Sequence, residues 1–422
     1  MFIFFYNILY ILFVLFYLPV FLLRRKGHPG ILMRLGFFPD KVIERLRGQK
    51  VFWVHTVSVG EAHAASCFIK VLKERYPGHR LVISTVTKTG NIVACNLAGK
   101  EDVVIYSPLD ISFIVRRVIE LVNPLLLIVA ETEIWPNLII NLSKRNIPVV
   151  VVNGRISAGS FKGYKLFRAF MKSILEKVSL FCMQTENDAQ KIIELGAERG
   201  RVKITGNMKF DVQSVDVAPQ NIDLGLTKEE RLFIAGSTHR GEERLILKVY
   251  KELVNDYPDL RLLIAPRHIE RAPEIEQLIV EFGFAPCRFS QSAVRKPQTA
   301  QRIFILDTIG QLKTLYAHAE IVYIGGSLVP HGGQNPIEAA VFAKPILFGP
   351  YMFNFSAIAG EFLRQKAAIM VNNEEQLKEA WQKILRDGQL RKELGENAQQ
   401  LIQQNQGATL RNINFIKEII NI

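Results

Sequence analysis

The sequence predicts an α/β protein made of two doubly wound domains that follow an N-terminal apolar segment. Three observations predict this architecture. Short β-branched runs alternate with amphipathic stretches, which is the pattern of βαβ units around buried parallel sheets. The alternation pauses near residues 211–228 and then restarts. The 422 residues are also enough for two or three domains of ordinary size.

The first 23 residues contain no charged side chain, and Arg24, Arg25 and Lys26 follow them directly. As a helix this segment would be about 34 Å long, which matches the hydrocarbon layer of a bilayer. Basic residues after the span, and no small-residue cleavage site, favour a retained anchor with the rest of the chain in the cytoplasm. A buried core helix and a partly inserted, monotopic helix are the alternatives. We expect a single membrane anchor over residues 1–23.

The first domain is expected over residues 24–211. Its strands are expected at residues 51–55, 81–85, 103–106, 125–130, 149–152, 180–183 and 202–204. Each is a nearly continuous apolar run, as in parallel strands buried on both faces. Residues 155–177 contain six basic residues and one acidic residue, with an apolar stripe at helical spacing. This stretch suits either an anionic membrane surface or an ordinary helix that packs inward.

A linker is expected over residues 212–228, which contain Pro, Gly and Asp and have no strong period. The second domain is expected over residues 229–422, and its pattern is helical from Glu374 onward. Its strands are expected at residues 232–235, 261–265, 303–306, 321–324 and 346–348.

The composition excludes several classes of protein. With 49% hydrophobic and 22% charged residues, the chain is not disordered. Its four cysteines form no CxxC pair, which argues against a disulfide framework or a zinc site. The net charge of +13 favours an anionic partner. The sequence contains no nucleic-acid-binding motif, so we expect no nucleic acid to bind. P-loop, GxGxxG and GxSxG motifs are also absent from the sequence.

Candidate residues in the first domain follow predicted strands, because open parallel sheets bind ligands at the carboxyl ends of their strands. Glu61 begins the helix after the first strand, where it either accepts a proton from a hydroxyl group or interacts with the helix dipole. Glu131 and Glu133 follow the fourth strand, as a pair of site acids or as solvated loop residues. Lys209 either meets an anion or lies on the surface. No HExxH or comparable set predicts a metal site.

The second domain carries a glycine-rich loop, GGSLVPHGGQNPIEAAVF, at residues 325–342. Its glycines allow close backbone approach, and Asn335 and Pro336 predict the N-cap and first residue of a helix. The free N–H groups of such a helix suit a phosphate. Glu338 is then either a capping-box residue or the acceptor of a ribose hydroxyl.

Two further segments are candidates for binding an anion or a base. Arg267, in the sequence APRH, suits a bidentate contact with phosphate or an ordinary surface ion pair. Gly310 and Gln311, in the sequence DTIGQL, either bind a base or phosphate or simply turn the chain.

The order and spacing of seven motifs resemble those of the bacterial Kdo (3-deoxy-D-manno-octulosonic acid) transferase family of lipopolysaccharide assembly. The motifs are HTVSVGEAHAA, ETEIWPN, VNGRIS, GNMKFD, PRHIER, DTIGQL and GGSLVPHGGQNPIEAA. The resemblance implies a GT-B fold, with the acceptor site mainly in the first domain and the nucleotide sugar mainly in the second. It also implies an inverting transfer, without metal or other cofactor, of Kdo from CMP-Kdo to a lipid A precursor (lipid IVA) at the bacterial inner membrane.

The resemblance also implies roles for individual residues. Glu61 resembles the general base, and Glu131 and Lys209 resemble residues that stabilise the transition state. The residues that resemble CMP-binding positions are Arg267, His268, Gly310, Gln311, Leu312, Asn335, Pro336, Ile337 and Glu338. Two alternatives are another membrane-associated GT-B transferase that uses a uridine-linked sugar, and a non-catalytic scaffold that binds a nucleotide.

Overall fold

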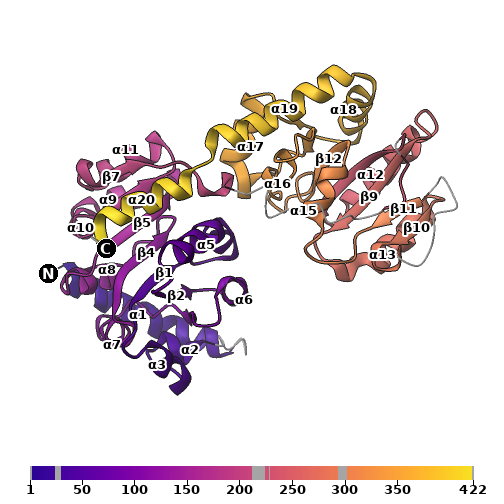
Figure 1. The fold of residues 1–422 in the computed structure, drawn as a ribbon. Coiled ribbons are helices and arrows are strands. Elements are labelled where there is room, and N and C mark those ends of the chain that lie inside the picture. The colour runs from indigo at the N-terminus through magenta and orange to yellow at the C-terminus, as the bar shows by residue number, and fades with distance from the viewer. Residues whose placement is uncertain (1, 24–29, 212–223, 228, 293–301, 421–422) are drawn as a thin grey trace. The chain divides into compact units, whose positions relative to one another are not determined.

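The computed structural model describes residues 2–23, 30–211, 224–227, 229–292 and 302–420 (Figure 1). They form two α/β units. Unit 1 consists of Met1–Asp211 and Asn405–Ile422, and unit 2 consists of Val212–Gln404. The fold class expected from the alternating pattern is confirmed, because each unit contains a seven-stranded parallel sheet.

The sheet of unit 1 has the strand order β3-β2-β1-β4-β5-β6-β7. Its strands are β1 (Val51–His55), β2 (Arg80–Thr85), β3 (Val103–Tyr106), β4 (Pro124–Ala130), β5 (Val149–Gly154), β6 (Leu180–Met183) and β7 (Val202–Ile204). All seven strands expected from the sequence are present. In the register of the sheet, His55 pairs with Ser84 of β2 on one side and with Val129 of β4 on the other.

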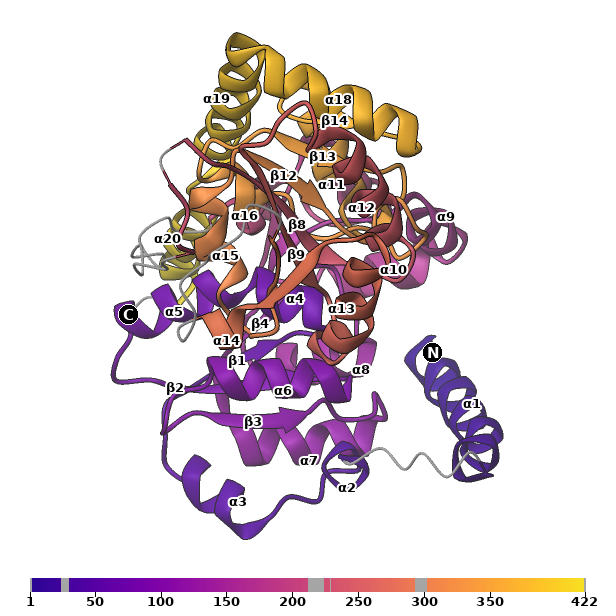
Figure 2. The same cartoon turned by 90° about the vertical axis from the view of Figure 1, so that its right-hand side faces the viewer.

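Helices cover both faces of this sheet. They are α1 (Phe2–Leu23), α2 (Ile31–Arg34), α3 (Asp40–Leu46), α4 (Val59–Ala64), α5 (Ser66–Arg75), α6 (Lys88–Leu97), α7 (Ser112–Val122), α8 (Pro136–Ser143), α9 (Ala158–Leu166), α10 (Arg168–Leu175), α11 (Glu186–Leu195) and α20 (Ala408–Ile420), with short 3₁₀ turns η1 (Arg199–Arg201) and η2 (Met208–Phe210). Figure 2 shows α6 and α7 on opposite sides of β3.

The two faces of the sheet form separate cores, because successive strand residues point to opposite faces. Trp53 packs on one face with apolar residues of α7, α8, α10 and α11. Phe52 and Val54 pack on the other face with residues of α5 and α20. Burial on both faces explains why these strands are almost continuously apolar.

Helix α1 contacts the rest of unit 1 through polar side chains. The Tyr6 hydroxyl donates a hydrogen bond to the Asp110 carboxylate at 2.9 Å. Asn7 and Asn137 exchange side-chain hydrogen bonds of 3.1 and 3.3 Å. Tyr6 also lies against Phe170 of α10, with 5.9 Å between the ring centroids. One side of the helix therefore faces protein.

The membrane-spanning anchor expected over residues 1–23 is not supported. Among the residues that the structure describes, no helix is both long and apolar enough to cross a bilayer. The expected basic flank, Arg24 to Lys26, lies outside the described residues. The expectation treated the segment as uniformly apolar, whereas Tyr6 and Asn7 give α1 a polar contact side.

The C-terminal helix α20 belongs to unit 1, although the sequence predicted it in the second domain. Ile413 and Ile416 are fully buried in the core that contains Phe52. The Asp211 carboxylate accepts hydrogen bonds from the backbone N–H groups of Gly407 and Thr409, at 2.6 and 2.5 Å. Helical periodicity gave no sign of which sheet this helix covers. Most of the expected linker (212–223 and 228) lies outside the described residues.

Unit 2 has the strand order β10-β11-β9-β8-β12-β13-β14. Its strands are β8 (Arg231–Thr238), β9 (Leu260–Pro266), β10 (Ala285–Arg288), β11 (Arg302–Ile305), β12 (Ile321–Ile324), β13 (Ile346–Phe348) and β14 (Ile369–Met370). The sequence did not predict β10 and β14. Both are short strands at the edges of the sheet, and their residues are partly exposed, so they lack the continuous apolar run of the central strands.

The helices of unit 2 are α12 (Glu242–Leu253), α13 (Ala272–Glu281), α14 (Phe289–Ser292), α15 (Leu312–Leu315), α16 (Ile337–Ala340), α17 (Ser356–Arg364), α18 (Glu374–Arg386) and α19 (Gly388–Asn405), with 3₁₀ turns η4 (Ile269–Arg271), η5 (Tyr316–His318) and η6 (Phe353–Phe355). Residues of α12, α13 and α18 form the core on one face of the sheet. Within this core the Trp381 ring stacks on Phe233 of β8, with 3.6 Å between centroids.

Candidate active site

The strand orders place candidate residues at the reversal points of both sheets. In unit 1 the order reverses between β1 and β4, and in unit 2 it reverses between β8 and β12. Ligands of doubly wound sheets bind outside the carboxyl ends of the strands at such points. Glu61 follows β1 and Glu131 follows β4, so both lie at the reversal point of unit 1.

The Glu61 carboxylate turns back over the start of α4. Its Oε2 accepts a hydrogen bond from the Val57 N–H at 2.6 Å, and its Oε1 accepts one from the Ser58 hydroxyl at 3.0 Å. Ser58 caps the helix and accepts a hydrogen bond from the Glu61 N–H. This arrangement resembles a capping box, except that Glu61 binds the N–H of Val57 and not that of Ser58. Glu61 lies in the first turn of α4, as the sequence predicted. Each carboxylate oxygen still has a second lone pair, so the same group can accept a further proton.

Burial raises the pKa of Glu61 above its usual value. The hydrogen bond from Val57 opposes this increase, the negative charge of Glu131 adds to it, and Ser58 and Arg155 oppose it. Only 9% of the Glu61 side chain is exposed. A carboxylate with a raised pKa is a better base than one in water, and this property is required for proton abstraction.

Glu131 is held between two cations that come from different elements. Arg155, just after β5, donates from Nε to its Oε2 at 2.8 Å. The Nζ of Lys209, in η2, lies 3.8 Å from its Oε1. The Glu131 backbone has a φ of +59°, in the left-handed region that is uncommon for residues other than glycine. Such strain is typical of functional positions.

Lys209 is largely buried, and burial lowers the pKa of its ammonium group. The charges of Glu131 and Glu61 raise this pKa, and Arg155 lowers it. These electrostatic interactions connect Glu61, Glu131 and Lys209. The structure therefore brings together the three residues that the resemblance identified in the first domain.

Glu133 joins the same group of charges. Burial, with the negative charges of Glu61 and Glu131, raises the pKa of Glu133 to about 7. The sequence indicated Glu131 and Glu133 together but assigned no role to Glu133. Like charges in one partly buried site cannot all ionise easily, so a proton is held on this carboxyl near neutral pH.

The histidine beside this site has a structural role. Trp135 donates from Nε1 to His55 Nε2 at 3.1 Å, and His55 Nδ1 lies 2.8 Å from the Ser84 hydroxyl. With Nε2 as an acceptor, the proton of the neutral ring is on Nδ1. Complete burial lowers the pKa of His55 to about 4, so the ring is neutral at physiological pH.

Unit 2 places the candidate CMP-binding residues on several loops after strands. Arg267 and His268 follow β9 and are exposed. Gly310 has a φ of +91°, and Gln311 and Leu312 begin α15. The His268 ring lies edge-on to His239, with 6.0 Å between centroids.

The predicted helix after the glycine-rich loop begins one residue later than expected and is short. Asn335 accepts a hydrogen bond from the Ile337 N–H at 3.2 Å, and Pro336 directly precedes α16. Glu338 does not complete the predicted capping box. Its hydrogen bond is to the side chain of Asn335, whereas a capping box requires one to the backbone N–H of that residue. Burial raises the pKa of Glu338, and Lys313, Asn335 and Arg267 oppose this increase. Segments near residues 267, 313 and 338 therefore lie close together.

Comparisons with known proteins show the family of this chain. Residues 30–212 match the family described as 3-Deoxy-D-manno-octulosonic-acid transferase (kdotransferase). A 3-deoxy-D-manno-octulosonic acid transferase of Haemophilus influenzae is 34% identical over 91% of this chain and 90% of its own length. One from Aquifex aeolicus is 31% identical over 81% of this chain and 87% of its own length. The chain belongs to the Kdo transferase family.

The fold of this chain is similar to that of solved structures. UDP-GlcNAc 2-epimerase from Neisseria meningitidis, bound to UDP-GlcNAc, covers 87% of this chain and 100% of its own, with a TM-score of 0.58 and 12% identity. A glycosyltransferase from Rickettsia africae covers 88% and 99%, with a TM-score of 0.54 and 14% identity. These likenesses show the GT-B fold of the chain.

Two residues of the Kdo transferase sites were not assigned roles from the sequence. Arg155 holds Glu131, and its signal was its position directly after β5 in the motif VNGRIS. Glu242 begins α12 after β8 and is completely buried. Glu61 is likewise in the first turn of the helix that follows a strand, and the same rule would have indicated Glu242.

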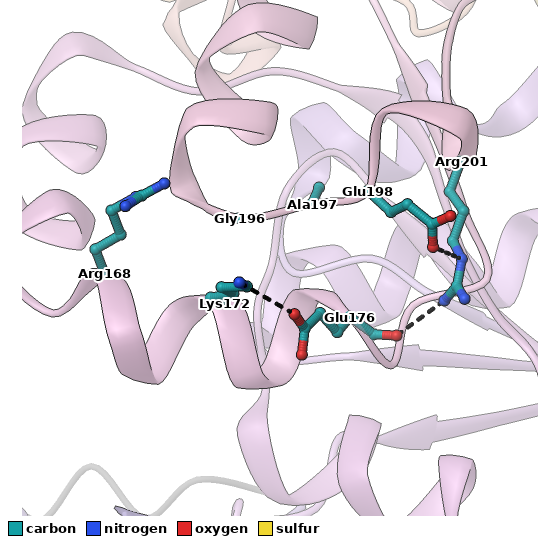
Figure 3. Close-up of a pocket in the computed structure, with 7 residues that line it drawn as sticks. All are labelled: Arg168, Lys172, Glu176, Gly196, Ala197, Glu198 and Arg201. Atoms are coloured by element: carbon teal, nitrogen blue, oxygen red, sulfur yellow. Dashed lines mark hydrogen bonds and ion pairs between the residues drawn. The ribbon is translucent and has the colours of Figure 1, made fainter.

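A hollow of about 560 Å³ in unit 1 contains none of the predicted site residues (Figure 3). It is lined by Arg168, Lys172, Glu176, Gly196, Ala197, Glu198 and Arg201. Lys172 pairs with Glu176 at 3.7 Å, and Arg201 pairs with Glu198 at 2.9 Å. Two of its three cations thus pair with glutamates of the same lining, and the candidate site lies at the reversal point of the sheet instead.

Proposed function

We propose that this Kdo transferase moves Kdo from CMP-Kdo to a hydroxyl group of a lipid A precursor, lipid IVA, with inversion and with Glu61 as the general base. The observation that carries the proposal is the buried Glu61 carboxylate at the reversal point of unit 1, with its raised pKa and neighbouring charges. Family membership supports the class of reaction, because Kdo transferases are the relatives of this chain.

The proposed reaction is a single displacement. The acceptor hydroxyl gives its proton to a Glu61 oxygen while its own oxygen bonds to the anomeric carbon of Kdo. The bond between that carbon and the phosphate oxygen of CMP breaks, and its electron pair leaves with the cytidylate. Attack opposite the leaving group inverts the anomeric centre.

Lys209 and Glu131 stabilise the transition state in this proposal. Lys209 supplies a positive charge that is partly removed from water, where electrostatic interactions are stronger. Arg155 and Lys209 both contact the Glu131 carboxylate, and these two contacts fix the position of the carboxylate. The Glu131 carboxylate therefore orients the Lys209 ammonium group. Because Arg155 also pairs with this carboxylate, Lys209 is not the only cation that balances its negative charge.

Unit 2 binds the CMP part of the donor in this proposal. Arg267 and His268 follow one strand, and Asn335 to Glu338 lie at the start of α16, in the second half of the glycine-rich loop. A leaving cytidylate carries one phosphate, and cationic and N–H donors can stabilise it without a metal ion.

The membrane association in this proposal is peripheral. The outer side of α1 exposes apolar residues, among them Leu9 (66%) and Phe16 (82%). Leu166 and Phe167, between α9 and α10, are also exposed, and basic residues of the two helices surround them. Apolar side chains with basic neighbours suit a bilayer that contains anionic lipid, where a lipid acceptor resides.

The proposal is tested by mass spectrometry of a lipid A precursor incubated with this protein and CMP-Kdo. Added mass equal to one or more Kdo residues, with release of CMP, supports it. A product formed only with a uridine-linked sugar would indicate the alternative transferase. No product with either donor, together with nucleotide binding, would indicate the non-catalytic scaffold.

A further inference from the structure

Glu242 is a completely buried carboxylate at the reversal point of unit 2. It is the first residue of α12 and follows β8 by four positions. None of its side chain is exposed. Burying a carboxylate is unfavourable unless hydrogen bonds satisfy its oxygens, so its partners define what it does.

Glu242 accepts five hydrogen bonds from three parts of unit 2. Its Oε2 accepts from the backbone N–H groups of His239 and Gly326, at 2.8 and 2.7 Å. Its Oε1 accepts from the Tyr323 hydroxyl at 2.6 Å and from the N–H groups of Ser327 and Leu328, both at 3.0 Å. One side chain thus joins the end of β8, the strand β12 and the glycine-rich loop.

These contacts change the interpretation of the glycine-rich loop. From the sequence, the loop glycines were expected to bring the backbone close to a phosphate. The structure shows that the N–H groups of Gly326, Ser327 and Leu328 bind the Glu242 carboxylate instead. Gly325 is required for a different reason, because a Cβ there would lie 2.3 Å from the Ser237 carbonyl oxygen. An internal anion therefore binds the first N–H groups of this segment, whereas the phosphate was expected at the N–H groups of the helix that begins near Asn335.

The loop held by Glu242 carries side chains that adjoin the candidate donor residues. The His239 ring stacks on His331 of the loop, with 4.2 Å between centroids. Gln334 lies with its Nε2 3.4 Å from His239 Nε2. His239 is in turn edge-on to His268. Glu242 fixes the backbone of His239 and the first turn of the loop, and so fixes how these rings lie.

We propose that Glu242 is the positioning residue of the donor half. It holds His239 and the glycine-rich loop in the arrangement in which His268 and residues 335–338 meet CMP-Kdo, and it does not contact the donor itself. This inference rests on the proposed function of unit 2.

The first experiment compares Glu242→Gln with Glu243→Gln in the full chain by calorimetric titration with CMP. Glu243 is a matched control, since it is also buried in the first turn of α12 but pairs with Arg271 at 2.7 Å. A glutamine at 242 turns an NH₂ group toward N–H donors, so at least two contacts are lost. We expect CMP to bind about 10-fold or more weakly to Glu242→Gln, and with near wild-type affinity to Glu243→Gln.

Kinetics separate positioning from a general loss of stability. We expect Glu242→Gln to raise the KM for CMP-Kdo more than it lowers kcat, and Tyr323→Phe, which removes one of the five hydrogen bonds, to give a smaller change of the same kind. Equal CMP affinity in wild type and Glu242→Gln would overturn the inference alone. If the wild-type protein does not bind CMP, the proposed function fails and the inference fails with it.

Hydrogen exchange on the wild-type protein tests the contacts if Glu242→Gln does not fold. We expect the N–H groups of residues 326–328 to be protected in nucleotide-free protein, and CMP to leave that protection unchanged. Rapid exchange without CMP, followed by protection when CMP binds, would show that the loop itself holds the phosphate and would overturn the inference.

Discussion

At the scale of single residues, three carboxylates share one partly buried site with two cations. Glu131 is paired with Arg155 and Lys209, and its negative charge adds to the increase that burial causes in the pKa of Glu61. Burial, together with the charges of Glu61 and Glu131, raises the pKa of Glu133 to about 7. The three carboxylates of the site are therefore held differently: Glu131 is paired with two cations, Glu61 is hydrogen-bonded at the start of α4, and Glu133 has a pKa near neutrality.

Lys209→Ala tests the cation of this group. If Lys209 stabilises the transition state, its loss lowers kcat for Kdo transfer by about 100- to 1,000-fold, as expected for one preorganised electrostatic contact. The measurement is the steady-state rate at saturating CMP-Kdo and acceptor. Lys177→Ala, which removes an exposed lysine of unit 1, serves as the control. A kcat equal to that of the control would remove Lys209 from this role.

Glu133 makes the stability of the protein dependent on pH. Its pKa is about 7 in the folded chain and 4.5 in the reference state, so the folded protein binds the proton more tightly. The contribution is fully favourable below about pH 4.5 and is lost as the pH rises through 7. The unfolding free energy of the wild type should therefore fall as the pH rises over this range. We expect a smaller fall for Glu133→Gln, measured by urea titrations at several pH values. An unchanged pH dependence would contradict the assignment.

At the scale of elements, one buried carboxylate joins α1 to the start of α8. Asp110 accepts hydrogen bonds from the Asn137 and Leu138 N–H groups, both at 3.0 Å, and from the Tyr6 hydroxyl. Burial raises the pKa of Asp110 to about 6, against the effect of these hydrogen bonds. Asp110 thus caps α8 and holds α1 at the same point.

Asp110→Ala should destabilise this junction. Loss of the cap leaves the N–H groups of α8 unsatisfied, and we expect the unfolding free energy to fall by about 2–3 kcal/mol. Asp40→Ala, at the exposed start of α3, is the control and should cost less than about 1 kcal/mol. Equal effects of the two substitutions in urea titrations would show that Asp110 has no special role.

The elements also show what sequence patterns can and cannot predict. Central strands such as β1 and β4 are buried on both faces, so their apolar runs were sufficient to identify them. The edge strands β10 and β14 are partly exposed and gave no such run. The position of Glu61 at the start of α4 is local and was predicted from the sequence, whereas the cap by Ser58 was not. The Glu242 contacts join segments more than 80 residues apart, and spacing cannot reveal them.

At the scale of the whole molecule, the chain returns to its first unit at the end. Ala408, Ile413 and Ile416 complete a core that residues 1–211 do not close by themselves. Asp211 fixes the start of α20 through two backbone N–H groups. A single domain boundary after residue 211 therefore assigns residues 405–422 to the wrong unit.

Deletion of residues 406–422 tests this arrangement. Each buried isoleucine contributes roughly 1.5–3 kcal/mol through removal of apolar area from water, so their joint loss is a large fraction of ordinary stability. We expect the thermal transition of unit 1 to shift to markedly lower temperature or to disappear. An unaltered transition in calorimetry would contradict the placement of α20 in the core of unit 1.

The central claim is that Glu61 takes the proton of the acceptor hydroxyl. The most direct test is the single-turnover rate of Kdo transfer by Glu61→Gln, at concentrations that saturate the enzyme with CMP-Kdo and lipid acceptor. Glutamine keeps one of the two hydrogen-bonding oxygens of Glu61 but cannot accept the proton. We predict a rate lower by about 100-fold or more, with unchanged CMP affinity. A rate close to that of the wild type would contradict the claim.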